Sequence, residues 1–390
     1  MTMRARSSVV TLRRAAAFAV AVAVACAVPG AARAQGALSM LGFGYPIAGL
    51  SARALATGGS LSGLDAQSPL NPAAIVLNSR AQAYGQYEPE MRTVTVGNVS
   101  TKTTTSRFPL FSVSGRQGSA TFAASFGAFM DRSWSNTYPD TQLIGGERLP
   151  STVVTQSQGG IAEARGAMAW SFTDRLHVGL GLHVFPGKNT VSVAREFPDS
   201  AHAGTFQVAN AYAFSGSAVS LGSVWIPGGH FVLSADMRFG GTMQMRLGDS
   251  TVVGQGKVPF RYGMSAAYDG IPGAVLVARL GSDKWTDLRG LGSSTLGLKD
   301  GTDVSFGAEV AGPRVSDVPS MARLGWRSRG LPFTYAGSGV TETAVTGGVG
   351  IPIIGGRTMV DIGVARVSRS GAGAVREKAW LVSVGVGIRP

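Results

Sequence analysis

The sequence contains one cysteine, Cys26, and only four histidines in 390 residues. Cys26 lies in a stretch with the order of a secretory leader: a basic head, an uncharged apolar run over residues 15–28, and small residues before Ala34. We therefore expect a signal peptide over residues 1–34, cleaved near Ala34. A lipoprotein attached through Cys26 is the alternative, but Ala23-Val24-Ala25 is a poor context for lipid attachment. Cleavage would leave a mature chain without disulfides or thiolate chemistry.

Charged residues are scarce, at 15% of the chain, and no later run approaches the roughly 20 apolar residues of a membrane-spanning helix. This excludes a helical membrane protein. The leader carries five arginines and no acid, so its removal lowers the formal net charge from +13 to +8. A basic exported protein meets anionic lipids or solutes, and we expect no nucleic-acid partner.

The motifs of common active sites are missing as well. The chain has no H-E-x-x-H or C-x-x-C motif, no G-x-S-x-G elbow, no Walker A loop and no G-x-G-x-x-G fingerprint. His177 and His183 share one strand face but lie roughly 20 Å apart along it, too far to bind one metal ion together. We predict no cofactor, no metal site and no catalytic residue, and therefore no enzyme.

Apolar residues alternate with polar or small residues in many parts of the chain. In residues 231–239, Phe231, Leu233 and Met237 fall on one face, and Asp236 and Arg238 fall on the other. Successive side chains of a strand point to opposite faces, so this pattern predicts a strand with one apolar and one polar face. About fourteen such runs follow the first eighty residues: 81–87, 107–114, 119–132, 163–172, 176–185, 210–225, 230–247, 257–268, 273–286, 302–310, 321–329, 341–353, 357–369 and 379–389.

The connections alternate in length, with short turns such as 115–118 and 173–175 between long loops such as 133–162 and 186–209. Short turns at one end and long loops at the other are typical of outer-membrane barrels. In lipid a sheet has to close so that every backbone polar group is paired. We therefore expect residues 79–390 to form an all-β, transmembrane antiparallel β-barrel of about 14 strands in a Gram-negative outer membrane. A large soluble β-sandwich or propeller is the alternative, which the low charge density disfavours.

Several basic residues fall on the inferred inward faces, beside the acids Asp236, Asp303, Glu309 and Asp361. Two interpretations stay open. The charges either neutralise one another in the lumen, or they form a basic constriction that favours anionic ligands such as carboxylates. The basic residues are Arg238, Arg261, Arg279, Arg323 and Arg327.

Residues 35–78 do not alternate. Residues 51–56 predict a short helix that Gly58 and Gly59 stop. Asn71 is a helix cap with Pro72 at the first helical position and Ala73 following, which predicts a second short helix up to Leu77. We expect this segment to be a helical hatch that plugs the lumen or lies beneath the barrel.

The same segment resembles the N-terminal signature of the FadL-like outer-membrane proteins. The resemblance lies in the run ARALATGG over residues 52–59, Asp65, and the motif Asn71-Pro72-Ala73, although Thr57 stands where the pattern usually has methionine. Residues 348–352 also look like the late strands of this group. It includes long-chain fatty acid transporters and the PorV-type barrels of type IX secretion.

The resemblance implies a fourteen-stranded barrel with an N-terminal hatch. In the transporters, hydrophobic ligands bind in the lumen and leave sideways through an opening in the wall. The first hypothesis is thus an outer-membrane channel for passive uptake of hydrophobic or amphipathic, fatty-acid-like small molecules. Its partners would be such a ligand, outer-membrane lipids and the barrel-assembly machinery. The second is a PorV-like barrel that docks partners in secretion or envelope assembly without transporting a solute.

Overall fold

The structure is a computed structural model that describes residues 43–389, apart from 79, 97–98, 199–203, 249–250, 292–296, 316, 336 and 372–374. The expected signal peptide, its cleavage near Ala34 and Cys26 lie outside the described residues. None of the helices in the described part has the length and apolar character that a membrane crossing requires.

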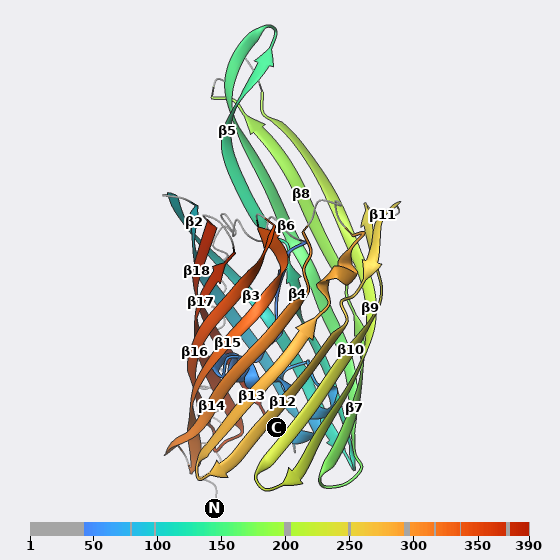
Figure 1. Cartoon of the computed structure of the whole chain (residues 1–390), viewed down its shortest axis with the longest axis vertical. Coiled ribbons are helices and arrows are strands. Elements are labelled where there is room, and N and C mark those ends of the chain that lie inside the picture. The colour runs from blue at the N-terminus through green and yellow to red at the C-terminus, as the bar shows by residue number, and fades with distance from the viewer. Residues whose placement is uncertain are drawn as a thin grey trace, which may run out of the picture. The chain divides into compact units, whose positions relative to one another are not determined.

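The chain forms one closed antiparallel sheet, in which consecutive strands are neighbours and β18 pairs with β2 (Figure 1). Of its eighteen strands, β1 belongs to the hatch, and β5, β8 and β11 continue the lines of β4, β7 and β12, which leaves a fourteen-stranded barrel. The strands are β1 (Tyr45–Pro46), β2 (Gln82–Val96), β3 (Val99–Gln117), β4 (Ala120–Asp131), β5 (Trp134–Ile144), β6 (Glu147–Ser171), β7 (Leu176–Val184), β8 (Gly187–Glu196), β9 (Phe206–Gly228), β10 (Phe231–Leu247), β11 (Thr251–Lys257), β12 (Arg261–Ile271), β13 (Ala274–Asp283), β14 (Gly301–Val315), β15 (Val318–Tyr335), β16 (Ser338–Ile353), β17 (Thr358–Ser370) and β18 (Val375–Ile388).

The faces of the wall are inverted relative to those of a water-soluble protein. On β10, Phe231, Met237 and Phe239 point outward and are exposed, whereas Asp236 and Arg238 point inward and are buried. A lipid-facing barrel requires this arrangement, since apolar side chains face hydrocarbon and polar side chains face the lumen. The structure thus confirms the predicted fold class, and each of the fourteen predicted runs overlaps a strand.

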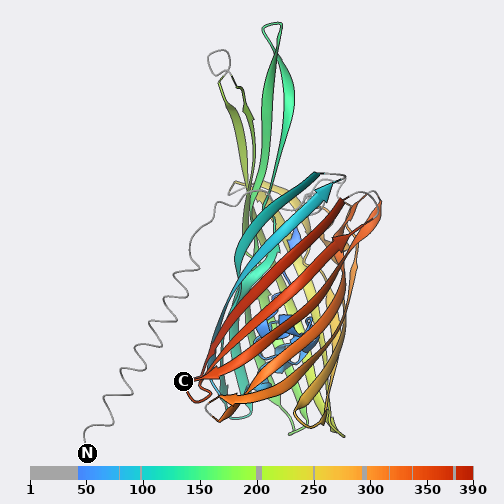
Figure 2. The same cartoon turned by 90° about the vertical axis from the view of Figure 1, so that its left-hand side faces the viewer.

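The prediction of long loops over 133–162 and 186–209 is wrong. The first range holds β5 and the start of β6, which pair as a hairpin, and the second holds β8 and the start of β9. We call residues 134–157, 187–196 and 206–211 the wing, and Figures 1 and 2 show that its strands extend beyond the upper rim of the barrel. Above the rim, lipid no longer selects an apolar side chain at every second position, so these strands give little alternating signal.

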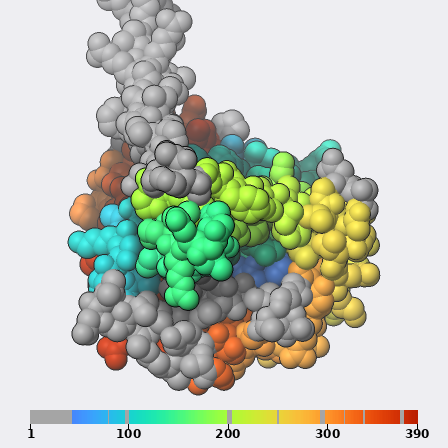
Figure 3. All heavy atoms as spheres, turned by 90° about the horizontal axis from the view of Figure 1, so that it is seen from above, coloured from blue at the N-terminus to red at the C-terminus, as the bar shows by residue number. Residues whose placement is uncertain are grey.

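The described part of the hatch, residues 43–78, lies inside the barrel. It contains β1, the helix α2 (Ala52–Ala56) and the 3₁₀ helices η2 (Ser60–Gly63) and η3 (Pro72–Leu77). Figure 3 shows the blue hatch through the upper mouth. The predicted helices are both present, although the second is a 3₁₀ helix, and Gly58 and Gly59 after α2 have positive φ angles of 70° and 90°.

Candidate functional site

The hatch rests directly on glycines of the wall. A Cβ added to Gly222 of β9 would lie 2.0 Å from Asn71 Oδ1, and one added to Gly325 of β15 would lie 2.1 Å from the carbonyl carbon of Thr57. Side chains at these positions would push the hatch away, since real Cβ contacts are not this short. Glycine in these strands therefore serves close backbone approach, and the hatch fills the lumen at this level.

The hatch motif Asn71-Pro72-Ala73 links η3 to the wall. Asn71 Oδ1 accepts a hydrogen bond from the backbone N of Ala73 (2.9 Å), which is the cap that the sequence predicts. Asn71 Nδ2 donates to the carbonyl oxygens of Gly63 (2.8 Å) and Ser223 (3.1 Å). One buried side chain thus joins two hatch helices and β9. Replacing it would leave three backbone groups without this partner.

A second link comes from α2. Arg53 forms a two-pronged ion pair with Glu309 of β14, with donor–acceptor distances of 2.9 and 2.7 Å. Glu309 also accepts from Arg323 (2.6 Å), which in turn donates to Asp361 (2.6 Å). The hatch is therefore held by charge as well as by shape on the β14–β17 side of the barrel.

The five arginines that the sequence places on inward faces do point inward, but they do not converge on one constriction. Each of the five has at least one carboxylate partner on another strand. One of these carboxylates, Glu309, also binds Arg53 of the hatch. The pairs are Arg238 with Glu163 (3.8 Å) and Asp283 (3.9 Å), Arg261 with Asp283 (3.8 Å), Arg279 with Asp236 (2.8 Å), Arg323 with Glu309 and Asp361 (2.6 Å each), and Arg327 with Glu342 (2.9 Å). This geometry favours mutual neutralisation; selectivity for anions at these five residues stays a prediction.

Sequence reasoning missed a buried network around Tyr45 of the hatch. The Tyr45 hydroxyl donates to Glu342 and accepts from Arg329 (2.5 Å) and Arg369 (2.9 Å). Burial raises the pKa of Tyr45, although Arg329 and Arg369 lower it, so the hydroxyl remains protonated at neutral pH. A tyrosine in a segment without periodicity gives no signal that it meets acids and bases roughly 300 residues away.

Two further inward arginines differ from the predicted five. Arg165 on β6 is buried, and its Nη1 atom has no hydrogen-bond partner among the described residues. The Nη1 atom of Arg132, between β4 and β5, also has no hydrogen-bond partner there. The Arg132 guanidinium carbon lies 4.1 Å from the ring centroid of Phe43 and 5.0 Å from that of Phe214. Among the described residues, neither guanidinium forms an ion pair with a carboxylate.

Glu163, His183 and Ser220 form a chain of short hydrogen bonds across β6, β7 and β9. Glu163 Oε1 lies 2.6 Å from His183 Nδ1, and His183 Nε2 lies 2.7 Å from Ser220 Oγ. These are the distances of a nucleophile, a base and an orienting acid. However, Ser220 is only 1% exposed, and a Cβ on Gly181 would lie 2.4 Å from its Oγ. The trio has no room for a substrate and joins three strands instead.

An apolar cluster lies at the upper end of the lumen, and we call it the upper apolar cluster. Its aromatic rings pack edge to face, as in Phe43 with Phe214 (5.8 Å between centroids) and Phe129 with Phe185 (4.8 Å). It draws residues from the hatch, from six strand lines and from the 3₁₀ helix η4 (Trp285–Leu288). Its members are Phe43, Phe129, Met130, Ile161, Phe185, Phe214, Ala218, Met243, Val258, Trp285, Leu288 and Leu291.

The wall is incompletely paired between β3 and β4. These strands pair over Leu110–Gln117 against Ala120–Gly127, and above that level β3 pairs with β2. The upper end of β4 pairs instead with β1 of the hatch, where Tyr45 is opposite Asp131 and Pro46 is opposite Met130. We call this line, from Val99–Pro109 on one side to Ala128–Asp131 on the other, the seam. At the seam a hatch strand takes the place of a wall strand.

Two residues at the foot of the seam account for its geometry. Pro109 has no backbone N–H to donate to a neighbouring strand. A Cβ on Gly127 would lie only 2.3 Å from the Pro109 carbonyl oxygen. A proline inside a predicted strand was the one sequence signal that marked this place.

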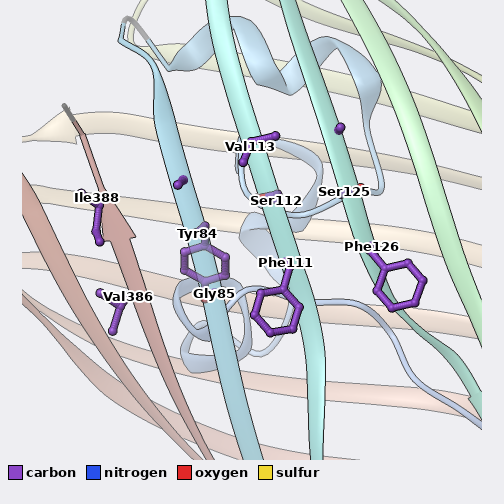
Figure 4. Close-up of a pocket in the computed structure, with 11 residues that line it drawn as sticks. Tyr84, Gly85, Phe111, Ser112, Val113, Ser125, Phe126, Val386 and Ile388 are labelled. Carbon is purple, nitrogen blue, oxygen red and sulfur yellow. The ribbon is translucent and has the colours of Figure 1, made fainter. Parts of the chain in front are cut away.

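Small cavities lie on the lumenal side of the seam, and a groove lies on the outer face below it, over the paired part of β3 and β4; they do not join into a channel. The lumenal cavities beside it, lined by residues such as Gly49, Pro109 and Gly127, have volumes of about 10 and 40 Å³, enough for a water molecule or two. On the outer face, a groove of about 580 Å³ runs over β18, β2, β3 and β4, where Phe111 and Phe126 lie side by side (Figure 4). Passage through the seam therefore requires movement of the hatch strand.

The outer groove alone does not mark the seam. A second outer groove of about 520 Å³ covers β9 to β14, where the neighbouring strands pair without a break of this kind. In the described residues, no group of three or more His, Cys, Asp or Glu is placed to hold a metal ion.

Comparison with solved structures identifies the fold. Similar structures are the CymD monoaromatic hydrocarbon channel (TM-score 0.58, 11% identity, 89% of this chain and 99% of that chain), the Ralstonia pickettii toluene transporter TbuX (0.57, 13%, 88% and 98%) and a Pseudomonas aeruginosa FadL homologue (0.60, 11%, 89% and 99%). No family model and no curated protein matches the sequence. The chain has the FadL-like barrel fold that the hatch signature indicates.

Proposed function

We propose that this protein is an outer-membrane channel for passive uptake of small hydrophobic molecules, exported by the leader over residues 1–34. The single observation that carries the proposal is the seam, where the hatch strand β1 replaces β3 beside β4. The hatch fills the lumen above glycines such as Gly222 and Gly325, so a straight axial path is blocked. A solute that enters from above has one weakly closed exit, through the wall into lipid.

Capture would occur at the upper apolar cluster. Its rings provide an apolar site next to Arg132, and Phe129 and Met130 of the cluster lie at the upper end of β4 beside the seam. A solute bound there would leave once β1 separates from β4. Burial of an apolar solute of this kind is favourable by about 25 cal/mol for each Å² removed from water.

Two ligand classes stay open within this proposal. The resemblance of the hatch favours fatty-acid-like amphipathic molecules, whereas two of the similar solved structures are named for monoaromatic hydrocarbons and toluene. Uptake of labelled toluene and labelled oleate should be compared in a Gram-negative host that lacks its own FadL-like channels. Uptake of neither ligand would contradict the proposal.

Cross-linking tests the seam directly. Arg107 and Asp131 face each other across it, with their side chains 4.0 Å apart, so cysteines at both positions accept a short bis-maleimide. The cross-link should reduce uptake at least about tenfold relative to the same variant before treatment, because a gate that cannot open does not conduct.

The matched control places cysteines at Thr341 and Ser370, which are opposite each other at the upper ends of β16 and β17, a fully paired part of the wall. Cross-linking there should leave uptake unchanged. Equal losses in both variants would mean that the reagent acts elsewhere, and no loss in the first would exclude the seam as the exit.

A docking barrel without transport is the second candidate function, and the wing favours it. The wing strands extend beyond the rim and carry exposed apolar side chains, among them Leu143 (62% exposed) and Phe206 (64%). Replacing residues 138–150 by a Gly-Ser turn should leave uptake intact if the protein is a channel. Docking would be favoured by two results together. The wing replacement would lose an envelope protein that co-purifies with the wild type, and the seam cross-link would have no effect on uptake.

A further inference from the structure

Four basic side chains lie close together on the outside of the barrel, at its upper rim. They are exposed and belong to neighbouring strands: Arg366 to β17, Arg376 and Lys378 to β18, and Lys102 to β3 beyond β2. Lys378 and Lys102 both lie opposite Thr93 of β2. Neighbouring strands are about 4.8 Å apart, so the four residues span roughly 15 Å across the wall. We call them the basic rim patch.

No acid shares this outer face with them. The acids of the same strands point into the lumen, where Glu90, Asp361 and Glu377 are buried. Arg369, one position away from the outward Ser368 and Ser370, points inward as well and binds Glu90 there (2.8 Å). In the described part of the chain, none of the four patch residues forms an ion pair. The positive charge of the basic rim patch is therefore available to an external partner.

The patch begins where the apolar band ends. On β18 the outward residues from the lower end are Ile388, Val386, Val384, Val382 and Trp380, followed by Lys378 and Arg376. Arg366 stacks over the Trp380 ring at 4.9 Å, and Tyr87 lies beside Phe108 at 5.2 Å one strand further on. Aromatic girdles of this kind mark the level at which hydrocarbon gives way to headgroups.

We propose that the basic rim patch binds the phosphorylated headgroup of an outer-leaflet glycolipid of the lipid A class. Positive charge without neighbouring acids, at headgroup height, complements phosphate groups that cannot leave the membrane plane. The hydroxyls of Thr93, Thr95 and Ser368 on the same face add hydrogen-bond donors. This inference rests on the proposed membrane placement of the barrel and not on transport.

The patch also adjoins the seam. Lys102 lies on the upper half of β3, the strand whose only strand partner at that level among the described residues is β2. A glycolipid held by Lys102 and Lys378 would bridge β3 to the closed side of the barrel. Binding would therefore hold the outer lip of the seam in place.

A triple variant with a charge-matched control tests the proposal. Lys102→Ser, Arg376→Ser and Lys378→Ser remove three patch charges and leave Arg366 on its tryptophan. Arg116→Ser, Arg314→Ser and Arg357→Ser remove three exposed charges from the opposite rim. Each protein is placed in phosphatidylcholine nanodiscs containing bisphosphorylated or dephosphorylated lipid A, and retained lipid is measured by native mass spectrometry.

The wild type and the control variant should retain phosphorylated lipid A, and the patch variant should bind it about 100-fold more weakly, near fivefold for each charge removed. Dephosphorylated lipid A should be retained weakly by all three. Equal retention by the two variants, or equal retention of both lipids by the wild type, would overturn the proposal. Failure of the wild type to insert into nanodiscs would overturn the membrane placement as well, whereas lack of solute uptake alone would leave lipid binding standing.

Discussion

The seam between β3 and β4 differs from the junction of β18 with β2, which we call the closed seam because the two strands pair along their length. Where the first and last strands meet, β18 pairs with β2 from Val375–Val96 down to Ile388–Ala83, and Arg369 of β17 reaches behind both strands to Glu90 (2.8 Å) and Glu377 (3.4 Å). Between β3 and β4 the pairing stops halfway, and the ion pair across the gap, Arg107 with Asp131, measures 4.0 Å. Backbone pairing and side-chain ties weaken at the same place.

The difference has a local cause. At the closed seam, β18 and β2 keep one register along their whole length, with a gap only at Val382 and Ser383. At the seam between β3 and β4, the pairing ends at Pro109 and Gly127. The hatch then fills the gap with two residues of β1. Lipid requires the backbone of the wall to be paired, and at the seam the pairing partner is a hatch strand, which can separate from the wall.

The largest effect on stability is expected at the closed seam. Arg369→Ala would leave Glu90 and Glu342 without the buried guanidinium that pairs with both. Removing one partner of a buried ion pair costs about 3–5 kcal/mol. Since Glu90 keeps Arg92 (3.0 Å) and Glu342 keeps Arg329 (2.8 Å), we expect the lower end of that range, about 3 kcal/mol. Urea unfolding of the refolded barrel in detergent should show this loss.

The control for this variant is Arg366→Ala, which changes an outward arginine three positions away on the same strand. Its effect should stay within about 0.5 kcal/mol, as for exposed substitutions in general. If both variants lose equal stability, the inward network does not hold the closed seam.

A smaller effect on stability, with a gain in permeability, is expected from Gly44→Val. Gly44 has a φ of +146°, and a Cβ there would lie 2.8 Å from the Asp131 carbonyl oxygen, so valine would displace β1 from β4. The strain should cost about 1–3 kcal/mol. The opened seam should raise the conductance of single barrels in planar bilayers.

Gly166→Val is the matched control, because a Cβ at this outward position of β6 meets no atom within 4 Å. It should alter neither stability nor conductance. Unchanged conductance in the Gly44 variant, together with a lower stability, would show that β1 is a structural tie and does not close a path.

The sequence predicts those parts of the barrel in which the local environment alone selects the type of residue. Lipid selects apolar side chains at every second position, so all fourteen wall strands are visible as alternation. The cap at Asn71 is equally local, since its acceptor serves Ala73 two residues later. Both features depend on neighbours in sequence or on the solvent alone.

The remaining features depend on partners that are distant in sequence. Arg279 is visibly inward, but its acid, Asp236, lies 43 residues away, and Glu342, which binds Arg327, was not recognised as a lumen acid. The wing strands lie above the rim (Figure 1), where lipid does not select alternating side chains, so they were predicted as loops. The seam depends on the absence of pairing, which only the register reveals; Pro109, inside the predicted run 107–114, is the residue that could have marked it.

The smallest expected effect comes from Asp131→Asn, which weakens the ion pair across the seam. Asparagine keeps the acceptor that Asp131 Oδ1 offers to the backbone N of Ser133 (2.9 Å), and Arg107 keeps Glu88 as a partner (3.1 Å). Stability should therefore fall by less than about 1 kcal/mol, as for a partly exposed pair. Because the lost charge lies at the seam, uptake of toluene should rise while stability barely changes. Asp140→Asn, which removes an ion pair with Arg195 in the wing, should leave uptake unaltered. A rise in both variants would separate uptake from the seam and assign it to the charge of the upper rim.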